Sequence, residues 1–393
     1  MKHKKTIYMD YAATTPQDTA VEKAMRVLYS SVFGNPSSSH SFGQAASRAV
    51  FLARQKVAKA LTADYKHIVF TGSATEANNM AICGVFDRAR TEMNMNNTPL
   101  RIVISAIEHD SVYEACARIR ERYGAEIIEV PVNARGIIDI KALEVALTPH
   151  TIMVSVQMVN SELGVIQPVQ KISAIIKQYK TKIGSTVYPV VHTDAVQAFQ
   201  YIPCNVENLG VDMLTLSGHK IYGPKGIGVL YVKNADILAP QIMGGGQERG
   251  IRSGTENVPA IIGFAQAIDD VERIRTKESK RVEKLRAMLW DGITKIIRDA
   301  ELNGSVTERV PNIISVYFPA RSAQDVCIEL DMMGVAVSPG TACSSRAAEP
   351  SRVIKALGFS GDRPLSSIRF SLGRGTTASE VRSVISILKK RFG

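Results

Sequence analysis

The sequence lacks the features that mark membrane, secreted or fibrous proteins. Its 393 residues include one tryptophan and 6% aromatic residues, and no run approaches the roughly 18–20 apolar residues that a membrane span needs. The basic start, Met-Lys-His-Lys-Lys, has no apolar segment after it of the kind found in signal peptides. We therefore expect a soluble globular protein with no membrane association, long enough for two domains.

Cysteine is scarce, and no Cys-x-x-Cys pair occurs among the five residues at positions 83, 116, 204, 327 and 343. This spacing argues against a disulfide framework or a resident zinc site, and it favours a cytoplasmic protein. The net charge of +11 fits an anionic ligand or an acidic partner. Because the basic residues are scattered and form no dense run with interleaved aromatics, we expect no direct binding of nucleic acid.

Apolar strand-like segments alternate with helical segments from residue 67 onward, a pattern typical of a mostly parallel sheet covered by helices on both faces. A charged helix at about 269–284 leads to a second group of elements. We predict an α/β protein with an N-terminal segment (1–20) associated with a small domain, a large domain (21–265) and a small α/β domain (266–393). Large-domain strands are predicted at 67–70, 101–105, 127–131, 151–159, 190–193 and 211–216, with an antiparallel return at 227–232; small-domain elements are predicted at 312–318, 323–333, 335–338, 367–371 and 378–392.

The stretch from Ser217 to Gly228 places Lys220 in a glycine-rich turn directly after the apolar run 211–216. A lysine held at the end of a buried strand can be desolvated, lose its proton and act as an amine nucleophile. The alternative is a glycine-rich hairpin with an exposed lysine, and this stretch alone does not separate the two.

Two further features are predicted at the ends of strands. Asp194 follows the apolar strand 190–193, and the turn 71–75 joins a strand to a helix start, where free backbone N–H groups can hold a phosphate. An ordinary salt bridge and an ordinary helix cap are the alternatives. Together, however, an amine, a carboxylate and an anion-binding turn are the groups that a pyridoxal phosphate enzyme requires.

A series of motifs, spread in order along the chain, makes the resemblance specific. They are Asp10-Tyr-Ala-Ala-Thr-Thr-Pro16, Gly34-Asn-Pro-Ser-Ser-Ser-His40, Ala74-Thr-Glu76, Glu108-His109, Val159-Asn-Ser-Glu-Leu-Gly164, His192-Thr-Asp-Ala-Val-Gln197, Ser217-Gly-His-Lys220, Arg252-Ser-Gly-Thr255 and Ser367-Ile-Arg-Phe-Ser-Leu-Gly373. From about residue 7 to residue 390 the chain resembles the cysteine desulfurase family, whose members are pyridoxal-phosphate-dependent transferases of fold type I with a mostly parallel seven-stranded sheet. It further resembles the branch with a long loop around the catalytic cysteine, since Ser338-Pro-Gly-Thr-Ala-Cys-Ser-Ser345 is followed by Glu349-Pro-Ser351 and Ala356-Leu-Gly358.

The resemblance implies a role for each matching residue. Lys220 would hold pyridoxal 5'-phosphate covalently and move the substrate's α proton, Asp194 would pair with the pyridinium nitrogen, and Gln197 would bond to the phenolic oxygen. His109 would stack on the ring and relay protons, although a lone histidine after a strand otherwise fits a packed or capping imidazole. Asn160 and Arg369 would bind the substrate carboxylate. The phosphate would be bound by Ala74, Thr75, Ser217, His219 and, from the partner subunit of a homodimer, Thr255.

Cys343 lies in a Gly-, Ser- and Ala-rich stretch in which a thiol can be exposed and deprotonated. The implied reaction converts L-cysteine to L-alanine and leaves a persulfide on Cys343 for a sulfur acceptor, in iron-sulfur cluster assembly or tRNA thiolation. The other four cysteines are interpreted as structural. No resident metal is expected, although Cys343 could ligate an iron-sulfur cluster transiently.

Some alternatives and departures from the family pattern remain. A selenocysteine lyase or another β-lyase would use the same scaffold, and a non-catalytic protein could have kept the fold for binding a partner. Ser161 and Thr341 stand where family members often have Asn and Ser, and both replacements are small and polar, so we expect activity to survive. The sequence ends at Gly393, soon after the last predicted helix, which leaves docking to a scaffold protein open.

Overall fold

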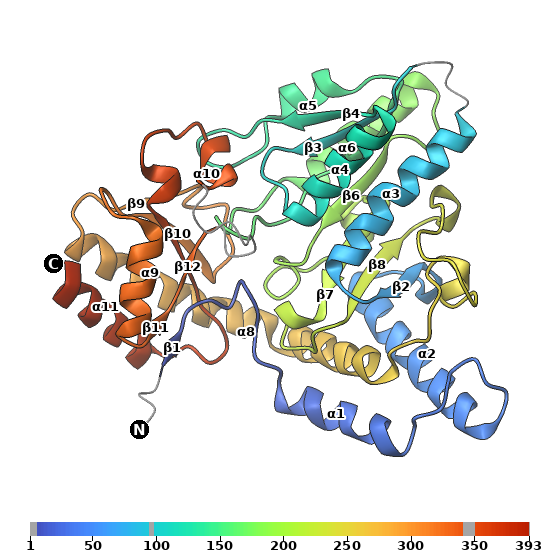
Figure 1. Ribbon diagram of the computed structural model, residues 1–393, viewed down its shortest axis with the longest axis horizontal. Coiled ribbons are helices and arrows are strands. Elements are labelled where there is room, and N and C mark those ends of the chain that lie inside the picture. Colours follow the sequence, from blue (N-terminus) through green and yellow to red (C-terminus); the bar gives the residue numbers. More distant parts are fainter. Residues whose placement is uncertain (1–5, 94–97, 341–349, 393) are drawn as a thin grey trace.

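The computed structural model describes residues 6–93, 98–340 and 350–392, and its strands form one large sheet and two smaller ones (Figure 1). The large sheet has seven strands in the order β2-β8-β7-β6-β5-β3-β4. All of them run parallel except β8, which is antiparallel to both neighbours. This confirms the predicted fold class and the antiparallel return. The strands are β2 (Ile68–Thr71), β3 (Arg101–Ser105), β4 (Glu126–Val130), β5 (Thr151–Ser155), β6 (Val190–Asp194), β7 (Met213–Ser217) and β8 (Gly228–Val232).

Helices bury an apolar layer on each face of this sheet, and all strands except the edge strand β4 are almost entirely buried, as in other parallel sheets. Ser73 caps the first of these helices by accepting the backbone N–H of Glu76, and Gly124 and Gly184 end two others in left-handed conformation. One face is covered by α3 (Ala74–Glu92) and α4 (Asp110–Tyr123), and the other by α2 (Ser41–Leu61), α5 (Ile140–Ala146), α6 (Val169–Ile183) and the first part of α8 (Val258–Ile296).

The C-terminal third forms an antiparallel sheet in the order β12-β13-β10-β9, with its own apolar core. The N-terminal strand β1 pairs with β11 beside this core. The predicted strand 335–338 is two short strands, because β11 pairs with β1 whereas β12 pairs with β13. The elements are β1 (Ile7–Tyr8), β9 (Glu301–Leu302), β10 (Ile313–Tyr317), α9 (Ala323–Met332), β11 (Val335–Ala336), β12 (Ser338–Pro339), α10 (Arg352–Ala356), β13 (Ser367–Ser371) and α11 (Ala378–Phe392).

Helix α8 joins the two groups and is longer than the predicted charged segment. Its 39 residues contact α2 and α1 (Thr19–Ser30) at one end and α11 at the other. The proposed domain boundaries, at residues 20 and 265, stay a prediction, and the second falls inside α8.

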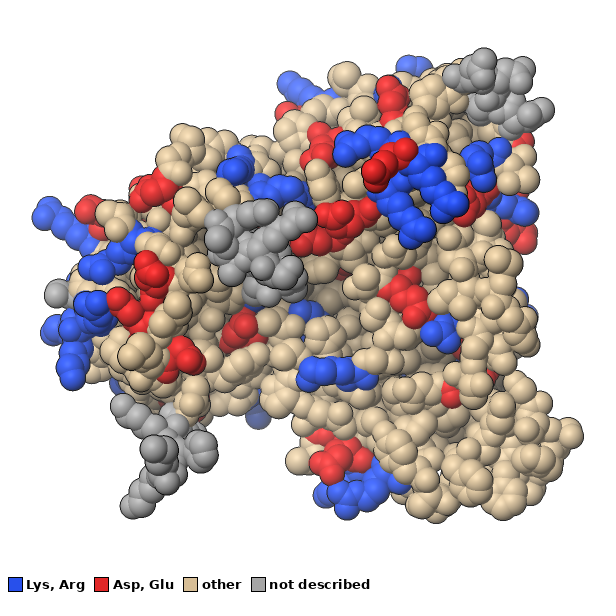
Figure 2. Space-filling view, in the orientation of Figure 1, with Lys and Arg blue, Asp and Glu red and all other residues tan. Residues whose placement is uncertain are grey.

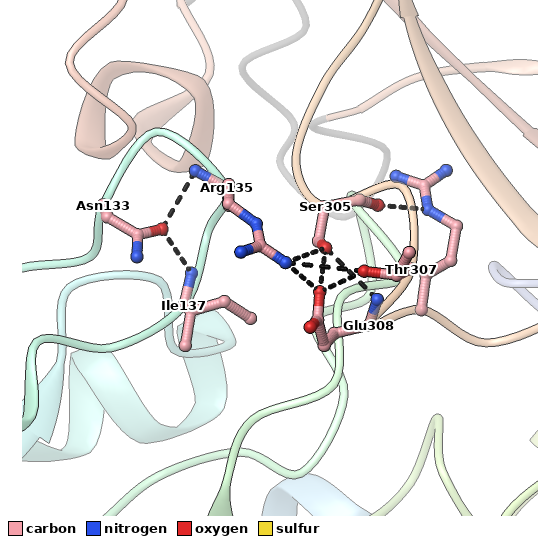
Figure 3. Close-up of polar contacts among 7 residues, drawn as sticks. Asn133, Arg135, Ile137, Ser305, Thr307 and Glu308 are labelled. Atoms are coloured by element: carbon pink, nitrogen blue, oxygen red, sulfur yellow. Dashed lines mark hydrogen bonds and ion pairs between the residues drawn. The ribbon is translucent and has the colours of Figure 1, made fainter.

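A second connection lies away from α8, where two loops meet (Figure 3). Arg135, from the loop after β4, forms an ion pair with Glu308 and donates to the hydroxyl oxygen of Ser305 at 3.2 Å. A backbone hydrogen bond holds the adjacent segment as well, since the Val310 N–H donates to the carbonyl of Gly164 at 2.8 Å. These contacts fix the small sheet against the large one. Among the described residues, no helix combines the length and apolar character needed to cross a membrane.

Candidate active site

Four strands of the large sheet end at one cavity of about 610 Å³. β3, β5, β6 and β7 are parallel, so their carboxyl ends meet at the same edge, which is where open α/β sheets bind ligands. The cavity is lined by His109 after β3, Gln157 after β5, Asp194 at the end of β6 and Lys220 after β7. Residues as far apart as 109 and 220 in the sequence therefore face one space.

Lys220 lies in a 3₁₀ turn, Gly218–Lys220, directly after β7. Its ammonium nitrogen Nζ donates to the carbonyl oxygens of Ala12 and Ala13, each at 2.6 Å. The turn requires glycine at 218, because a Cβ there would lie 2.6 Å from Cγ2 of Ile227. The turn does join two antiparallel strands, but its lysine lines the cavity and is not an exposed hairpin side chain.

Asp194 is buried, with 7% of its surface exposed. Its Oδ2 accepts from the Asn78 amide at 2.8 Å, and its Oδ1 accepts from the Val196 N–H at 2.9 Å. Within the described parts of the chain it forms no ion pair, so the ordinary salt bridge is absent there. A buried carboxylate that lines a cavity and is held by neutral donors is suited to a cationic ligand group.

The turn before α3 forms another part of the cavity lining. The backbone N–H groups of Ala74 and Thr75 occupy the first turn of the helix, where they have no partner within the helix. Strand β8 passes close behind: a Cβ at Gly228 would lie 2.5 Å from the carbonyl carbon of Ser73. Two such donors at the positive end of a helix dipole suit a phosphate.

Ser217 and His219 line the same cavity. Burial, together with the nearby charges of Lys220 and Lys225, lowers the pKa of His219 to about 4. Its ring is therefore neutral at pH 7, and Nδ1 lies 3.1 Å from the hydroxyl oxygen of Thr14. A neutral imidazole can offer one N–H to an anion without carrying a charge of its own.

His109 and Gln197 also line the cavity. His109 caps α4: its Nδ1 accepts from the Ser111 N–H at 3.1 Å. The capping role that the sequence left open is therefore real, and it holds the ring at the cavity. Gln197 donates its amide to the carbonyl oxygen of Ala12 at 2.9 Å.

Arg369 enters the cavity from β13 of the small sheet and is almost completely buried. Its guanidinium donates to Oδ1 of Asp10 at 2.7 Å and to the carbonyl oxygen of Ser161 at 3.0 Å. The Nε atom is buried and has no hydrogen-bond partner in the described parts of the chain. Arg369 is therefore already ion-paired with Asp10 at the cavity.

The structure does not bring two of the predicted residues, Asn160 and Thr255, to the cavity. The amide of Asn160 donates to the Ile107 carbonyl at 3.0 Å, and its oxygen accepts from the N–H groups of Glu162 and Leu163, so the side chain is used by the backbone and does not line the cavity. Thr255 is exposed and is absent from the cavity lining. Cys343 lies outside the described residues.

Sequence reasoning missed several polar residues of the site. Asn78 is fully buried on α3 and bonds to both Asp194 and Ser111. A polar side chain three residues after the phosphate-type turn, on the buried face of a helix, was the available signal. Residues that line the cavity and were not predicted include Asn79, Ser111, Arg118 and Gln157.

The donor set fits one kind of cofactor. The cavity combines a primary amine, a buried carboxylate without a cation and a helix terminus suited to phosphate, which match the aldehyde, the ring nitrogen and the phosphate of pyridoxal 5'-phosphate. No group of three or more His, Cys, Asp or Glu side chains arranged to hold a metal occurs in the ranges that the structure describes. With the seven-stranded sheet, this site defines the class as pyridoxal-phosphate enzymes of fold type I.

The comparison with known proteins places the chain within that class. It belongs to the aminotransferase class-V family, whose model matches residues 7–384. It is 41% identical to the cysteine desulfurase IscS of Dictyoglomus turgidum (98% of this chain, 94% of the relative), and 38% identical to the putative cysteine desulfurase IscS 1 of Bacillus subtilis (96% of each). Among solved structures, it is similar to a NifS-like protein (TM-score 0.89, 34% identity, 98% of each chain) and to SspA in complex with cysteine (TM-score 0.78, 33% identity, 93% of this chain and 99% of that one).

Proposed function

We propose that the chain is a pyridoxal-phosphate-dependent cysteine desulfurase that removes sulfur from L-cysteine and releases L-alanine. The observation that carries this proposal is the placement of Lys220 and Asp194 at the ends of neighbouring parallel strands in one cavity, with the phosphate-type turn of α3 beside them. Relatives that match nearly the whole chain are named cysteine desulfurases.

Each side of the cofactor would be held by a different part of the cavity. Lys220 binds it covalently, Asp194 stabilises a protonated ring nitrogen, and Gln197 bonds to the phenolic oxygen. The phosphate is held by the N–H groups of Ala74 and Thr75 and by the side chains of Ser217 and His219. When bound, pyridoxal phosphate supplies an electron sink that makes the substrate's α proton acidic.

Substrate binding would use the small sheet. Arg369, which lines the cavity, binds the L-cysteine carboxylate through charge-assisted hydrogen bonds. Lys220 would take the α proton, and His109 would lie against the cofactor ring and relay a proton. Asn160 would bind the same carboxylate only if its hydrogen bond to the Ile107 carbonyl breaks when the substrate binds.

Sulfur transfer is assigned to Cys343. Its thiolate attacks the substrate sulfur, the new S–S bond forms as the Cβ–S bond breaks, and the sulfur stays on Cys343 as a persulfide while the protonated carbon skeleton leaves as L-alanine. The other cysteines are poor nucleophiles, because burial raises the pKa of Cys204 and of Cys327 to about 12 and also raises the pKa values of Cys83 and Cys116.

A homodimer completes the proposed site. Large apolar side chains are exposed around the junction of α1 and α2. In the view of Figure 2, the outer end of this junction shows no charged side chain. Rings of Phe33 and Phe42 pack 5.4 Å apart there, with 64% and 53% of their surfaces exposed. We propose that this surface meets a second copy and that exposed Thr255 reaches the partner's phosphate. Other exposed apolar side chains here are Val27, Tyr29, Phe51 and Leu52.

The persulfide would then pass to an acceptor protein of iron-sulfur cluster assembly or tRNA thiolation, in the cytoplasm. The reducing compartment is supported by four cysteines that are all free thiols where the structure describes them.

The proposal is tested by intact mass spectrometry after addition of L-cysteine without reductant, with alanine measured in parallel. We expect a gain of one sulfur that maps to Cys343 and appears with alanine, and neither sulfur gain nor wild-type alanine release in Cys343→Ser. Alanine release at the wild-type rate by that variant would instead indicate a β-lyase or selenocysteine lyase mechanism. A protein that cannot bind the cofactor would support a non-catalytic role.

A further inference from the structure

The glycine-rich loop, residues 243–255, is joined by two ion pairs to two helices that cover the large sheet. In one pair the loop supplies the carboxylate, and in the other it supplies the guanidinium. Near its middle, Glu248 of the loop accepts two hydrogen bonds from Arg54 of α2, at 2.6 and 2.7 Å. Nearer its end, Arg252 of the loop donates to Glu76 of α3, with Nε 2.7 Å from Oε1 and Nη2 3.4 Å from Oε2. Neither pair has a role in the function proposed above.

Glu76, the partner of Arg252, lies next to the proposed phosphate site. Glu76 lies in the first turn of α3, directly after Ala74 and Thr75, and its Oε2 accepts from the Gly72 N–H at 3.0 Å. The carboxylate is thus packed against the turn that is proposed to hold the phosphate; a Cβ at Gly72 would lie only 2.8 Å from that oxygen. A bare carboxylate here would repel a phosphate dianion, because only 22% of the side chain is exposed to screening solvent.

Arg252 compensates the charge of the Glu76 carboxylate. Its guanidinium covers the Glu76 carboxylate, is itself 22% exposed, and has its pKa raised chiefly by the hydrogen bond to Glu76. The carboxylate can then keep the turn in shape through Gly72 while its charge is compensated. We propose that Arg252 is a positioning residue that sets the affinity of the α3 turn for the cofactor's phosphate by neutralising Glu76, and that it does so without touching the cofactor.

The Arg54–Glu248 pair shows what a purely structural pair looks like in the same loop. Both side chains are nearly inaccessible, at 9% and 2% exposure, and Glu248 also accepts the Phe70 N–H of β2. The loop passes through left-handed conformation at Glu248 and Arg249, with φ angles of 48° and 60°, which costs energy in non-glycine residues. This pair holds a strained backbone in place and contacts β2, not the Glu76 carboxylate or the first turn of α3, so its loss should reduce stability and not phosphate selectivity.

The inference rests on the proposed function, because it takes the α3 turn as the phosphate site. Its test compares two probes, pyridoxal 5'-phosphate and pyridoxal, which differ only in the phosphate. The full-length protein is freed of cofactor by dialysis and titrated with each probe, and binding is followed by the probe's absorption and by the fluorescence of the single tryptophan, Trp290. Inorganic phosphate is added in a parallel titration, where it competes with pyridoxal 5'-phosphate for the phosphate site.

In Arg252→Gln we expect the dissociation constant for pyridoxal 5'-phosphate to rise at least about tenfold, which corresponds to about 1.4 kcal/mol. Binding of pyridoxal should change by less than about twofold, because it carries no charge near Glu76. Adding Glu76→Gln should restore most of the lost affinity, since Gln can still accept the Gly72 N–H. Arg252→Lys should stay close to wild type. As a matched control, Arg88→Gln removes an exposed ion pair with Glu92 at the far end of α3 and should affect neither probe.

Three results would overturn the inference. Equal loss of both probes in Arg252→Gln, or no recovery in the double variant, would mean that the pair only holds the fold. Wild-type affinity in Arg252→Gln would mean that Glu76 does not act on the phosphate. If the wild-type protein bound both probes equally or neither, the α3 turn would not be a phosphate site, and the proposed function would fail together with the inference. Should Arg252→Gln not fold, as judged by circular dichroism, Glu76→Gln alone decides: it must bind pyridoxal 5'-phosphate at least as tightly as wild type.

Discussion

Two buried charged side chains, Asp194 of the large sheet and Arg369 of the small one, face the same cavity but are held in different ways. Asp194 is fixed by Asn78 and by the backbone of Val196, both within one sheet-and-helix unit. Arg369 is fixed by Asp10 and by the carbonyl of Ser161, which lie 359 and 208 residues away in the chain.

This difference separates the two halves of the proposed chemistry. The cofactor side of the cavity is built by neighbouring parallel strands, and its geometry follows once the sheet forms. The substrate side depends on contacts between segments remote in sequence, and its guanidinium already has a carboxylate partner in Asp10. We therefore expect changes on the cofactor side to abolish chemistry, and changes on the substrate side to weaken binding.

The largest effect is expected for Lys220→Ala. Removal of the amine takes away both the covalent link and the group that moves the α proton, so alanine release should fall by at least about 10³-fold, the upper part of the range for general acid–base groups. The turn before α3 is unchanged, so the variant should still bind pyridoxal 5'-phosphate noncovalently. Single-turnover alanine measurement and the absorption spectrum report the two properties. Residual activity within tenfold of wild type would remove Lys220 from the mechanism.

On the same side, Asp194→Asn should lower kcat by about 10²-fold, the scale found when one preorganised electrostatic group is lost from an active site. The neutral amide keeps the shape of the residue and can still accept from Asn78, but it cannot stabilise a protonated ring nitrogen. The KM for L-cysteine should change little, because Asp194 is not expected to contact the substrate. A variant with raised KM and unchanged kcat would contradict the comparison between the two sides.

On the substrate side, Arg369→Lys should raise the KM for L-cysteine by about 10- to 100-fold, the value of one or two hydrogen bonds to a charged group. Lysine keeps the charge that Asp10 requires but loses the planar pair of donors. The cofactor spectrum should remain that of the wild type. A shift in that spectrum, or loss of kcat without change in KM, would show that the two sides are not separate.

Much of the cofactor side could be predicted from the sequence because its signals are local. An apolar run followed by Asp194, and another followed by a glycine-rich turn with Lys220, identify strand ends, and parallel strands bring their ends together. The strands β3 and β13 coincide with their predicted bounds, whereas β5 ends four residues early, where Gln157 and Asn160 turn their amides to the Ile107 carbonyl.

The substrate side could not be derived in the same way. Nothing in the residues around Arg369 indicates that its guanidinium donates to Asp10 and to the carbonyl oxygen of Ser161. These contacts depend on how the small sheet packs against the large one. The helix α6 was also missed: no helix was predicted between residues 159 and 190. Its amphipathic stretch starts after Pro168 without a capping side chain, so the usual start signal is absent.

The smallest effect concerns Glu108, a buried carboxyl group on the residue before His109. Burial raises the pKa of Glu108 to about 8, although Ser105 and the backbone of Gln157 donate to its Oε1. Because the folded protein holds this proton up to about pH 8 while the unfolded chain releases it near pH 4.5, this group makes the free energy of unfolding fall as the pH rises between those values. Below pH 4.5 and above pH 8 its contribution should not change with pH.

Glu108→Gln should therefore flatten the fall in stability between about pH 5 and pH 8 while leaving kcat within a few fold, because Gln mimics the protonated acid and keeps the acceptor at Oε1. Urea unfolding of the cofactor-loaded protein at several pH values measures this difference. If the variant showed the same pH slope as the wild type, Glu108 would be ionised in the folded state. Its charge would then act on Asp194, and the electrostatics of the cofactor side would have to include a second buried anion.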